Sequence, residues 1–581
     1  MKKDDDVTLK GLFLPLTTKK TVIFMTLIGF FVFFNALFGH FVWDDVGYIL
    51  SNPKVHVVNL SFLFGANNSF NAAGYYRPIS ATYFAIIYSI FGNQPFFFHL
   101  IQISIHIINS ILIYILFKRF FKEKLSLFLS IIFLIHPINV ESVAYIGASQ
   151  SVILIFFGLL AILINLQPIP RFRKITILFL LLLLTLLTKE TGVLFVLVIF
   201  CYQWLFKRKE TIIYLILSFI TVTTYLCIRF FVGNIYLFKI PFIPMARLSF
   251  AQRLESIPAI ILYYFKTLSF PKDLIIEQQW VVTSSTLFNF YLPIVIILVL
   301  SCLLLFLGTK LYRSDKLRFK QLVFFSCWFV SGILFLIQLF PLDMTVADRW
   351  FYFPFIGLLG VIGIIVTRFV KLKKYRNIIS VLGLAIIILL STRTIIRNND
   401  WHDDLTLLEH DTKIETNFDK ENNLGLALSQ AGDMRQALIH FQKSALLEPF
   451  ELNLTNIGGT YLKLNKPELG KSYLEQALLA KRYSSFDHKH ELSVYVNYAT
   501  YLTFYDLPKK AAQFTKIALQ DYPSSGKLYY LLAIAEYLQK NNEQSLIDIQ
   551  KALVLNPTPQ ANYVYNQIYN NLPLVINNQA K

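Results

Sequence analysis

Residues 21–53 read TVIFMTLIGFFVFFNALFGHFVWDDVGYILSNP, and this one stretch joins a long apolar run to two adjacent acids. Its first twenty or so residues are apolar, which is enough to cross the roughly 30 Å hydrocarbon core of a bilayer. The run is too long for a signal-peptide core and has no clean cleavage site, so it predicts a first membrane span. Asp44 and Asp45 follow at once, flanked by Trp43 and Tyr48, two residue types that gather at membrane surfaces.

The rest of the composition extends this interpretation. The 581 residues are 55% hydrophobic and 16% aromatic, which is far more apolar than a soluble protein of this size. After position 400 the chain has 17 Lys and Arg against 19 Asp and Glu, whereas the part before it has 37 against 16. A basic membrane part indicates cytoplasmic loops, not nucleic-acid binding. All four cysteines lie in apolar segments, so neither a disulfide framework nor a cysteine metal site is expected.

Clusters of Lys and Arg set the predicted topology, because such clusters stay on the cytoplasmic side. They place residues 1–20 in the cytoplasm and predict eleven spans. Eleven is odd, so the part from 401 onward should lie on the extracytoplasmic side. The stretch 256–270 is either another helix or a re-entrant piece. The predicted spans are 21–41, 97–117, 125–137, 150–166, 175–188, 191–206, 211–231, 290–308, 321–340, 351–370 and 377–396.

This predicted topology puts most acids of the membrane part on the extracytoplasmic side. Asp44 and Asp45 begin a large first extracytoplasmic loop, residues 42–96. Ionisable groups beside hydrocarbon are costly and tend to be functional. The other acids on or near the same side are Glu141, Glu190, Glu255, Asp273, Glu277, Asp343 and Asp348.

Residues 401–581 have the composition of a soluble helical domain with an internal repeat. Positions equivalent to Ala518 and Pro523 recur 34 residues later as Ala552 and Pro557. About four copies of a tetratricopeptide pattern are predicted, in which small residues let paired helices approach and a proline follows the second helix. Such an α-solenoid is typical of a protein-binding surface.

Five short motifs stand in a fixed order before these repeats: FVWDDVGYILSNPKV (41–55), YYRPIS (75–80), HPINVESVAYI (136–146), TKETG (188–192) and ADRWFYFP (347–354). In this order the chain resembles the transmembrane and tetratricopeptide repeat-containing group of GT-C glycosyltransferases, which is related to protein O-mannosyltransferases. The resemblance implies an all-α GT-C-type helix bundle over 21–400. It also implies a polyprenyl- or dolichyl-phosphate-linked sugar as donor, mannose by resemblance, and a protein Ser or Thr hydroxyl as acceptor.

The residues suit that chemistry. A carboxylate can take the proton of an acceptor hydroxyl as general base, so Asp44 and Asp45 are the catalytic candidates, with a slight preference for Asp45. Arginine and lysine can hold the phosphate of the donor. The candidates for that role are Arg77, Arg349 and Lys189. The candidates for substrate binding or structural support are Glu190, His136, Glu141, Asp348 and Tyr76.

Each candidate also has a plainer interpretation. The aspartate pair could cap a helix end, and Arg77 could extend its charge to the membrane surface. His136 could act structurally next to a proline. Local ion pairs are open for Lys189 with Glu190 and for Asp348 with Arg349. His99 and His106 are expected to pack within the bundle, because no third metal ligand is evident.

One stretch departs from the family. After AYIG many relatives have a basic residue followed shortly by an acid, whereas here Ala148, Ser149, Gln150 and Ser151 follow. A charged contact in the relatives is therefore absent here or replaced by neutral hydrogen bonds, which bears on sugar specificity more than on reaction class.

Three classes of function compete. The first is a multi-pass membrane glycosyltransferase with no required cofactor, in a bacterial inner membrane or an endoplasmic reticulum membrane. Its partners would be the bilayer, the lipid-linked donor and a polypeptide bound by the repeats. The second is a non-enzymatic scaffold or assembly factor, and the third a lipid-linked oligosaccharide ligase or a transporter. A transporter is expected to have charges near mid-membrane, whereas the charges here lie at span ends. A monophosphate donor does not require a divalent metal.

Overall fold

A computed structural model describes residues 17–65, 74–235, 243–369, 376–480 and 491–574. Within these ranges the chain is helical, and the one extended pairing is an isolated bridge between Gln278 and Val346. The prediction of an all-α protein is confirmed. The chain forms two compact units, one up to Leu407 and one from Leu408 onward.

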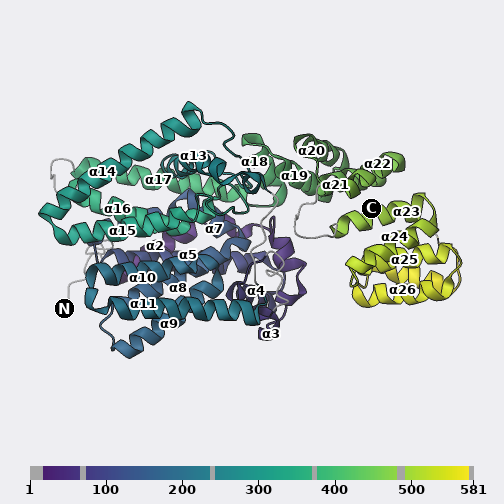
Figure 1. The fold of residues 1–581 in the computed structure, drawn as a ribbon, viewed down its shortest axis with the longest axis horizontal. Coiled ribbons are helices and arrows are strands. Elements are labelled where there is room, and N and C mark those ends of the chain that lie inside the picture. The colour runs from purple at the N-terminus through teal and green to yellow at the C-terminus, as the bar shows by residue number, and fades with distance from the viewer. Residues whose placement is uncertain (1–16, 66–73, 236–242, 370–375, 481–490, 575–581) are drawn as a thin grey trace, which may run out of the picture. The chain divides into compact units, whose positions relative to one another are not determined.

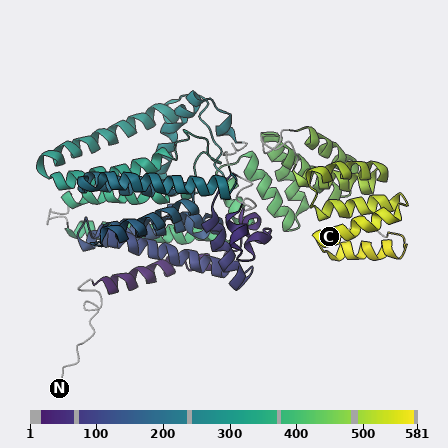
Figure 2. The ribbon, with the colours of Figure 1, turned by 60° about the horizontal axis from the view of Figure 1, so that its bottom comes forward.

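The first unit holds long apolar helices that run side by side (Figures 1 and 2). Prolines at the first positions of helices such as Pro78–Phe91 and Pro95–Phe117 suit that place, because the missing N–H has no partner there in any helix. The helices are α2 (Thr18–Val32), α3 (Leu60–Phe64), α4 (Pro78–Phe91), α5 (Pro95–Phe117), α6 (Glu123–Ile135), α7 (Val140–Ala144), α8 (Ser149–Asn165), α9 (Arg171–Thr188), α10 (Val193–Phe206), α11 (Thr211–Cys227), α12 (Pro244–Arg247), α13 (Phe250–Ser269), α14 (Leu292–Ser314), α15 (Lys316–Leu334), α16 (Tyr352–Phe369) and α17 (Arg376–Asp400).

Among the described residues, seven helices are long and apolar enough to cross a membrane, or up to eight if the bent pair Glu123–Ile135 and Pro137–Ala144 is one span. Each of the eleven predicted spans overlaps a helix, but α2 already ends at Val32 within the predicted span 21–41. Three of these helices, α2, α9 and α10, do not meet the same length and hydropathy test. Pro78–Phe91 is a further, shorter apolar helix inside the stretch predicted as a loop. The stretch 256–270 belongs to α13, a regular helix despite its internal Pro258.

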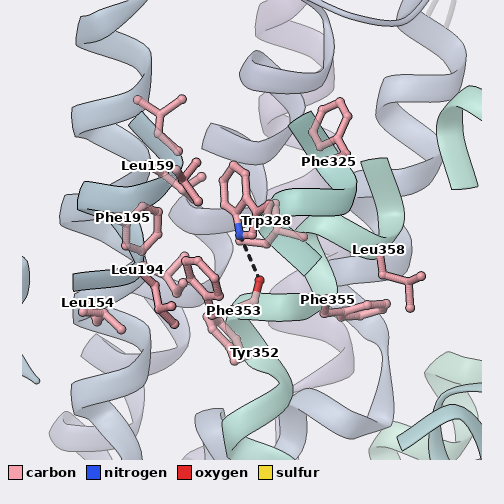
Figure 3. Close-up of a cluster of buried hydrophobic side chains, with 14 of the residues drawn as sticks. Leu154, Leu159, Leu194, Phe195, Phe325, Trp328, Tyr352, Phe353, Phe355 and Leu358 are labelled. Carbon is pink, nitrogen blue, oxygen red and sulfur yellow. Dashed lines mark hydrogen bonds between the residues drawn. The ribbon is translucent and has the colours of Figure 1, made fainter. Parts of the chain in front are cut away.

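The core of this unit is aromatic and aliphatic and lies where α8, α10, α15 and α16 meet (Figure 3). Trp328 is fully buried, and its indole N–H donates to the carbonyl of Phe353 at 3.2 Å. The Phe195 ring meets both side chains edge-on. Gly158 faces that ring so closely that a Cβ there would lie 2.3 Å from it, so this contact of α8 with α10 requires glycine.

The second unit is a run of helix pairs (Figure 2). The pairs pack as expected for tetratricopeptide repeats: a Cβ on Gly425 would lie 2.6 Å from Phe441, and one on Gly458 would lie 2.6 Å from Leu474. Small residues therefore set the close approach within each pair. α18 (Asp404–Ile414) begins in the first unit, and the rest are α19 (Phe418–Gln430), α20 (Met434–Leu447), α21 (Glu451–Lys463), α22 (Pro467–Leu479), α23 (Leu492–Tyr505), α24 (Pro508–Asp521), α25 (Gly526–Leu538), α26 (Asn542–Leu555) and α27 (Pro559–Tyr569).

Candidate functional site

Asp45 is buried, and its carboxylate binds two backbone N–H groups. Its carboxylate accepts the backbone N–H of Gly147 at 2.6 Å on one oxygen and that of Val42 at 3.1 Å on the other. The residue is fully buried, and this burial raises its pKa well above the usual value against the effect of both hydrogen bonds. The contact to Gly147 joins two segments 102 residues apart. Asp45 therefore fixes the loop after α2 to the turn before α8.

Asp44 is held less tightly than its neighbour. Its carboxylate is only partly buried, and its contact with the Tyr145 hydroxyl is long, at 3.5 Å. Burial raises the pKa of Asp44 to about 6, although the positive charge of Arg349 lowers it. A carboxylate of this kind is poised to exchange a proton near neutral pH.

Aromatic side chains surround Asp44. Trp43 takes a left-handed backbone conformation, with φ of 53°. Its backbone N–H donates to the Asp404 carboxylate at 2.6 Å. The Tyr145 ring lies between the rings of Trp43 at 5.3 Å and Trp401 at 5.5 Å, and it stacks on the latter. A bulky residue at positive φ is rare and is kept only where its surroundings impose it. These contacts hold the loop that carries Asp44.

Arg77 is the centre of a second polar cluster. Its Nε donates to Glu190 at 3.0 Å, its Nη1 donates to Gln150 at 2.6 Å, and its guanidinium lies over the Tyr75 ring. Glu190 also accepts the backbone N–H of Tyr76 at 3.1 Å and pairs with Arg229 at 3.6 Å. One carboxylate is thus shared by two arginines, which leaves this cluster with a net positive charge.

Lys189 supplies a further cation beside this cluster. Its Nζ donates to the Ser151 hydroxyl at 3.3 Å. Burial, together with the positive charges of Arg77 and Arg349, lowers the pKa of Lys189 to about 7. Arg77 and Arg349, the other two predicted phosphate-binding cations, therefore both lie close enough to Lys189 for their charges to act on it.

Arg349 pairs with a distant acid. It forms a buried ion pair with Glu141, whose other oxygen accepts the Arg349 backbone N–H at 2.9 Å. Its guanidinium also lies 3.9 Å from Asp343 and over the ring of Trp43. The positive charge of Arg349 also lowers the pKa of Asp44, so this cation lies near the candidate base.

The other predicted site residues support the scaffold. His136 is buried and bridges the backbone, since its Nδ1 accepts from Ile138 and its Nε2 lies 3.0 Å from the Leu268 carbonyl. The buried Tyr76 donates its hydroxyl to the Phe64 carbonyl at 2.9 Å. Asp348 accepts from the Tyr263 hydroxyl at 2.7 Å.

Several residues that were not among the predicted site residues contact them. Gln150 and Ser151 contact two of the cations, Arg229 shares Glu190, and Asp343 lies near Arg349. Tyr145 touches Asp44, and its place within HPINVESVAYI was a usable signal. No group of three or more potential metal ligands occurs in the part of the chain that the structure describes.

Comparisons with known proteins find similarity both to the repeat part and to most of the length of the chain. Residues 453–483 match the family model of the tetratricopeptide repeat. The chain is 24% identical to the human protein O-mannosyl-transferase TMTC3 over 80% of its own length and 56% of that protein's. It is 24% identical to the Caenorhabditis elegans protein O-mannosyl-transferase F38B6.6 over 74% of its own length and 63% of that protein's. A shorter stretch of 139 residues is 31% identical to the human protein O-mannosyl-transferase TMTC1.

The resemblance to the transmembrane and tetratricopeptide repeat-containing group is therefore confirmed. The chain spans only 56 to 63% of the length of the first two relatives. The apolar helices and these relatives together fit a multi-pass membrane protein.

Proposed function

We propose that this protein is a membrane glycosyltransferase that moves mannose from a polyprenyl-phosphate carrier to a Ser or Thr hydroxyl of a polypeptide. The observation that carries the proposal is Asp44, a partly buried carboxylate with a raised pKa that lies near the cation Arg349, whose charge also acts on Lys189. The names of the relatives support the same reaction class.

The residues divide the reaction between them. The acceptor oxygen attacks the anomeric carbon, and its proton passes to Asp44 as general base. The bond from the anomeric carbon to the phosphate oxygen breaks, and the electron pair leaves with the lipid phosphate. That phosphate gains negative charge, which Arg77, Arg349 and Lys189 are placed to stabilise. Neither step needs an oxidant or a reductant.

The geometry favours Asp44 over Asp45 as the base, which reverses the slight preference drawn from the sequence. Both oxygens of Asp45 are occupied by backbone N–H groups, and the residue is sealed from solvent. Asp44 has a single long contact and remains partly accessible. We assign Asp45 the role of holding the loop in place.

We propose that residues 21–400 carry out the reaction and that the repeats of 401–581 recruit the polypeptide acceptor. The acids at the span ends and the charge pattern of the sequence support an extracytoplasmic position for the reacting groups and for the repeats. A membrane part that served only as a scaffold would have no need for the buried pairs Arg77–Glu190 and Arg349–Glu141, which costly desolvation disfavours.

A direct test uses the full-length protein in membranes with radiolabelled mannose on polyprenyl phosphate. Labelled protein should appear with this donor, and it should not appear with GDP-mannose once synthesis of the lipid carrier is blocked. Equal labelling from the nucleotide sugar under that block would refute a lipid-linked donor.

The dependence of kcat/KM on pH should be bell-shaped. Below about pH 6 the raised pKa of Asp44 leaves the base protonated, so the rate falls as the pH drops. Above about pH 7 Lys189 loses its proton, so the site loses a positive charge and the rate falls again. Initial rates from pH 4.5 to 9 at low donor concentration measure both limbs.

Lys189→Arg gives the control, because arginine stays charged throughout this range. It should remove the alkaline limb and leave the acid limb in place. A wild-type profile that is flat from pH 5 to 8 would contradict both assignments.

A further inference from the structure

The turn that leads into α8 touches three groups of the site. Gly147 donates its N–H to Asp45, Gln150 contacts Arg77, and Ser151 contacts Lys189. A Cβ on Gly147 would lie 2.6 Å from the Tyr145 hydroxyl. Position 147 must therefore be glycine for the Tyr145 ring to pack where it does. A segment of five residues thus connects the loop of the candidate base to two of the cations.

Gln150 joins two parts of this arrangement. Its Nε2 donates to the Gly147 carbonyl at 3.3 Å, while its Oε1 accepts from Arg77 Nη1 at 2.6 Å. The hydrogen bonds run from Asp45 through Gly147 and Gln150 to Arg77, and from there to Glu190. The amide therefore fixes the guanidinium relative to the loop that carries Asp44.

The amide orients Arg77 without neutralising it. Glu190 provides the one negative charge that Arg77 contacts among the described residues, and it shares that charge with Arg229. Nη2 of Arg77 makes no hydrogen bond to any residue that the structure describes, so it can reach an anionic ligand. A carboxylate in place of the amide would compete with that ligand for the same guanidinium.

The neighbouring residues point to an anion as well. Ser151 holds Lys189 by a neutral contact. The hydroxyl of Ser149 is fully buried and has no partner among the described residues. It lies at the N-terminus of α8, a 17-residue helix whose first turn carries a partial positive charge.

We infer that Gln150 is a positioning residue that sets the affinity of the site for the phosphate of the lipid-linked donor. It holds Arg77 in place and leaves its charge for the phosphate. The neutral run Ser149–Ser151 places no competing charge beside Arg77 and Lys189. The inference rests on the proposed function, because it specifies how the same site binds its donor.

The test is the binding of polyprenyl-phosphate mannose to the purified full-length protein in lipid nanodiscs. Gln150→Glu should weaken binding by at least about tenfold at pH 7.5, because the new charge offsets that of Arg77. A purely structural role for the side chain would give Gln150→Glu and Gln150→Met the same loss of binding.

Two further variants complete the design. Gln150→Met keeps the length of the side chain and adds no charge, so it should weaken binding by only about threefold at every pH through the lost hydrogen bond. Gln203→Glu is the matched control, since Gln203 is also a buried amide and donates to Asn165 at 2.6 Å on the other end of α8. It should leave the donor Kd unchanged.

The outcomes separate the two proposals. If the wild-type protein fails to bind polyprenyl-phosphate mannose, the proposed function falls, and this inference with it. If the wild type binds and Gln150→Glu binds equally well, the proposed function stands and the role of Gln150 is refuted. If Gln150→Glu does not fold, an unchanged Kd for Gln150→Met refutes that role instead.

Discussion

Asp44→Asn is expected to lower the rate of mannose transfer by about 10²- to 10⁴-fold, the range that a general base contributes. The amide has the shape of the carboxylate but cannot accept the proton of the acceptor hydroxyl. Donor binding should stay close to wild type, because Arg77, Lys189 and Arg349 are untouched. Initial rates at saturating donor, together with a direct donor-binding measurement, separate the two effects.

Asp45→Asn is the matched control for this variant. An asparagine offers one acceptor oxygen where the carboxylate offers two, so one of the N–H groups of Val42 and Gly147 loses its partner. The expected result is a lower melting temperature, with a rate per folded molecule within about tenfold of wild type. A collapse of the rate in Asp45→Asn with full activity in Asp44→Asn would overturn the assignment of the base.

The fold was largely predictable because its signals are local in the sequence. Runs of apolar residues mark the membrane helices, and Pro449, Pro523 and Pro557 mark where helices of the repeats end. Such patterns depend on neighbours within one or two turns. The span count was less secure, because short apolar helices such as α4 and α10 differ little from true spans in composition.

The partners within the site could not be read from the sequence. Local pairs of Lys189 with Glu190 and of Asp348 with Arg349 were the natural alternatives. The structure instead pairs Glu190 with Arg77 across 113 residues and Glu141 with Arg349 across 208. These pairs depend on how α7 and the segments that precede α4, α10 and α16 pack, which no local pattern specifies.

The different roles of Asp44 and Asp45 also follow from tertiary packing and not from a local sequence pattern. Adjacent acids at a span end look equivalent in the sequence, and the backbone N–H groups of Gly147 and Val42, which both donate to Asp45, tell them apart. Gln150 was noted as a departure from the family, and its contact with Arg77 gives that departure a physical meaning. Motif order indicated the candidate residues, whereas the tertiary contacts show which side chains and backbone groups each of them binds.

Glu190→Gln is expected to cause the largest loss of stability among single changes at the site, about 3–5 kcal/mol. The carboxylate is contacted by Arg77 at 3.0 Å and Arg229 at 3.6 Å, and the side chains of these arginines are 11% and 4% exposed. Removing its charge leaves two buried cations without their shared counter-ion, next to Lys189. The midpoint of thermal unfolding in detergent, followed by tryptophan fluorescence, measures the effect.

Glu123→Gln provides the comparison, because Glu123 also pairs with a cation at 3.0 Å but does so with side chains about one third exposed. Exposed pairs contribute only about 0–1 kcal/mol, so this variant should unfold near the wild-type temperature. A second readout tests the electrostatic cause. Glu190 helps to keep Lys189 protonated, so its loss should move the alkaline limb of the pH profile to lower pH. If both glutamine variants unfold alike and the limb stays in place, Glu190 does not balance the charges of this site.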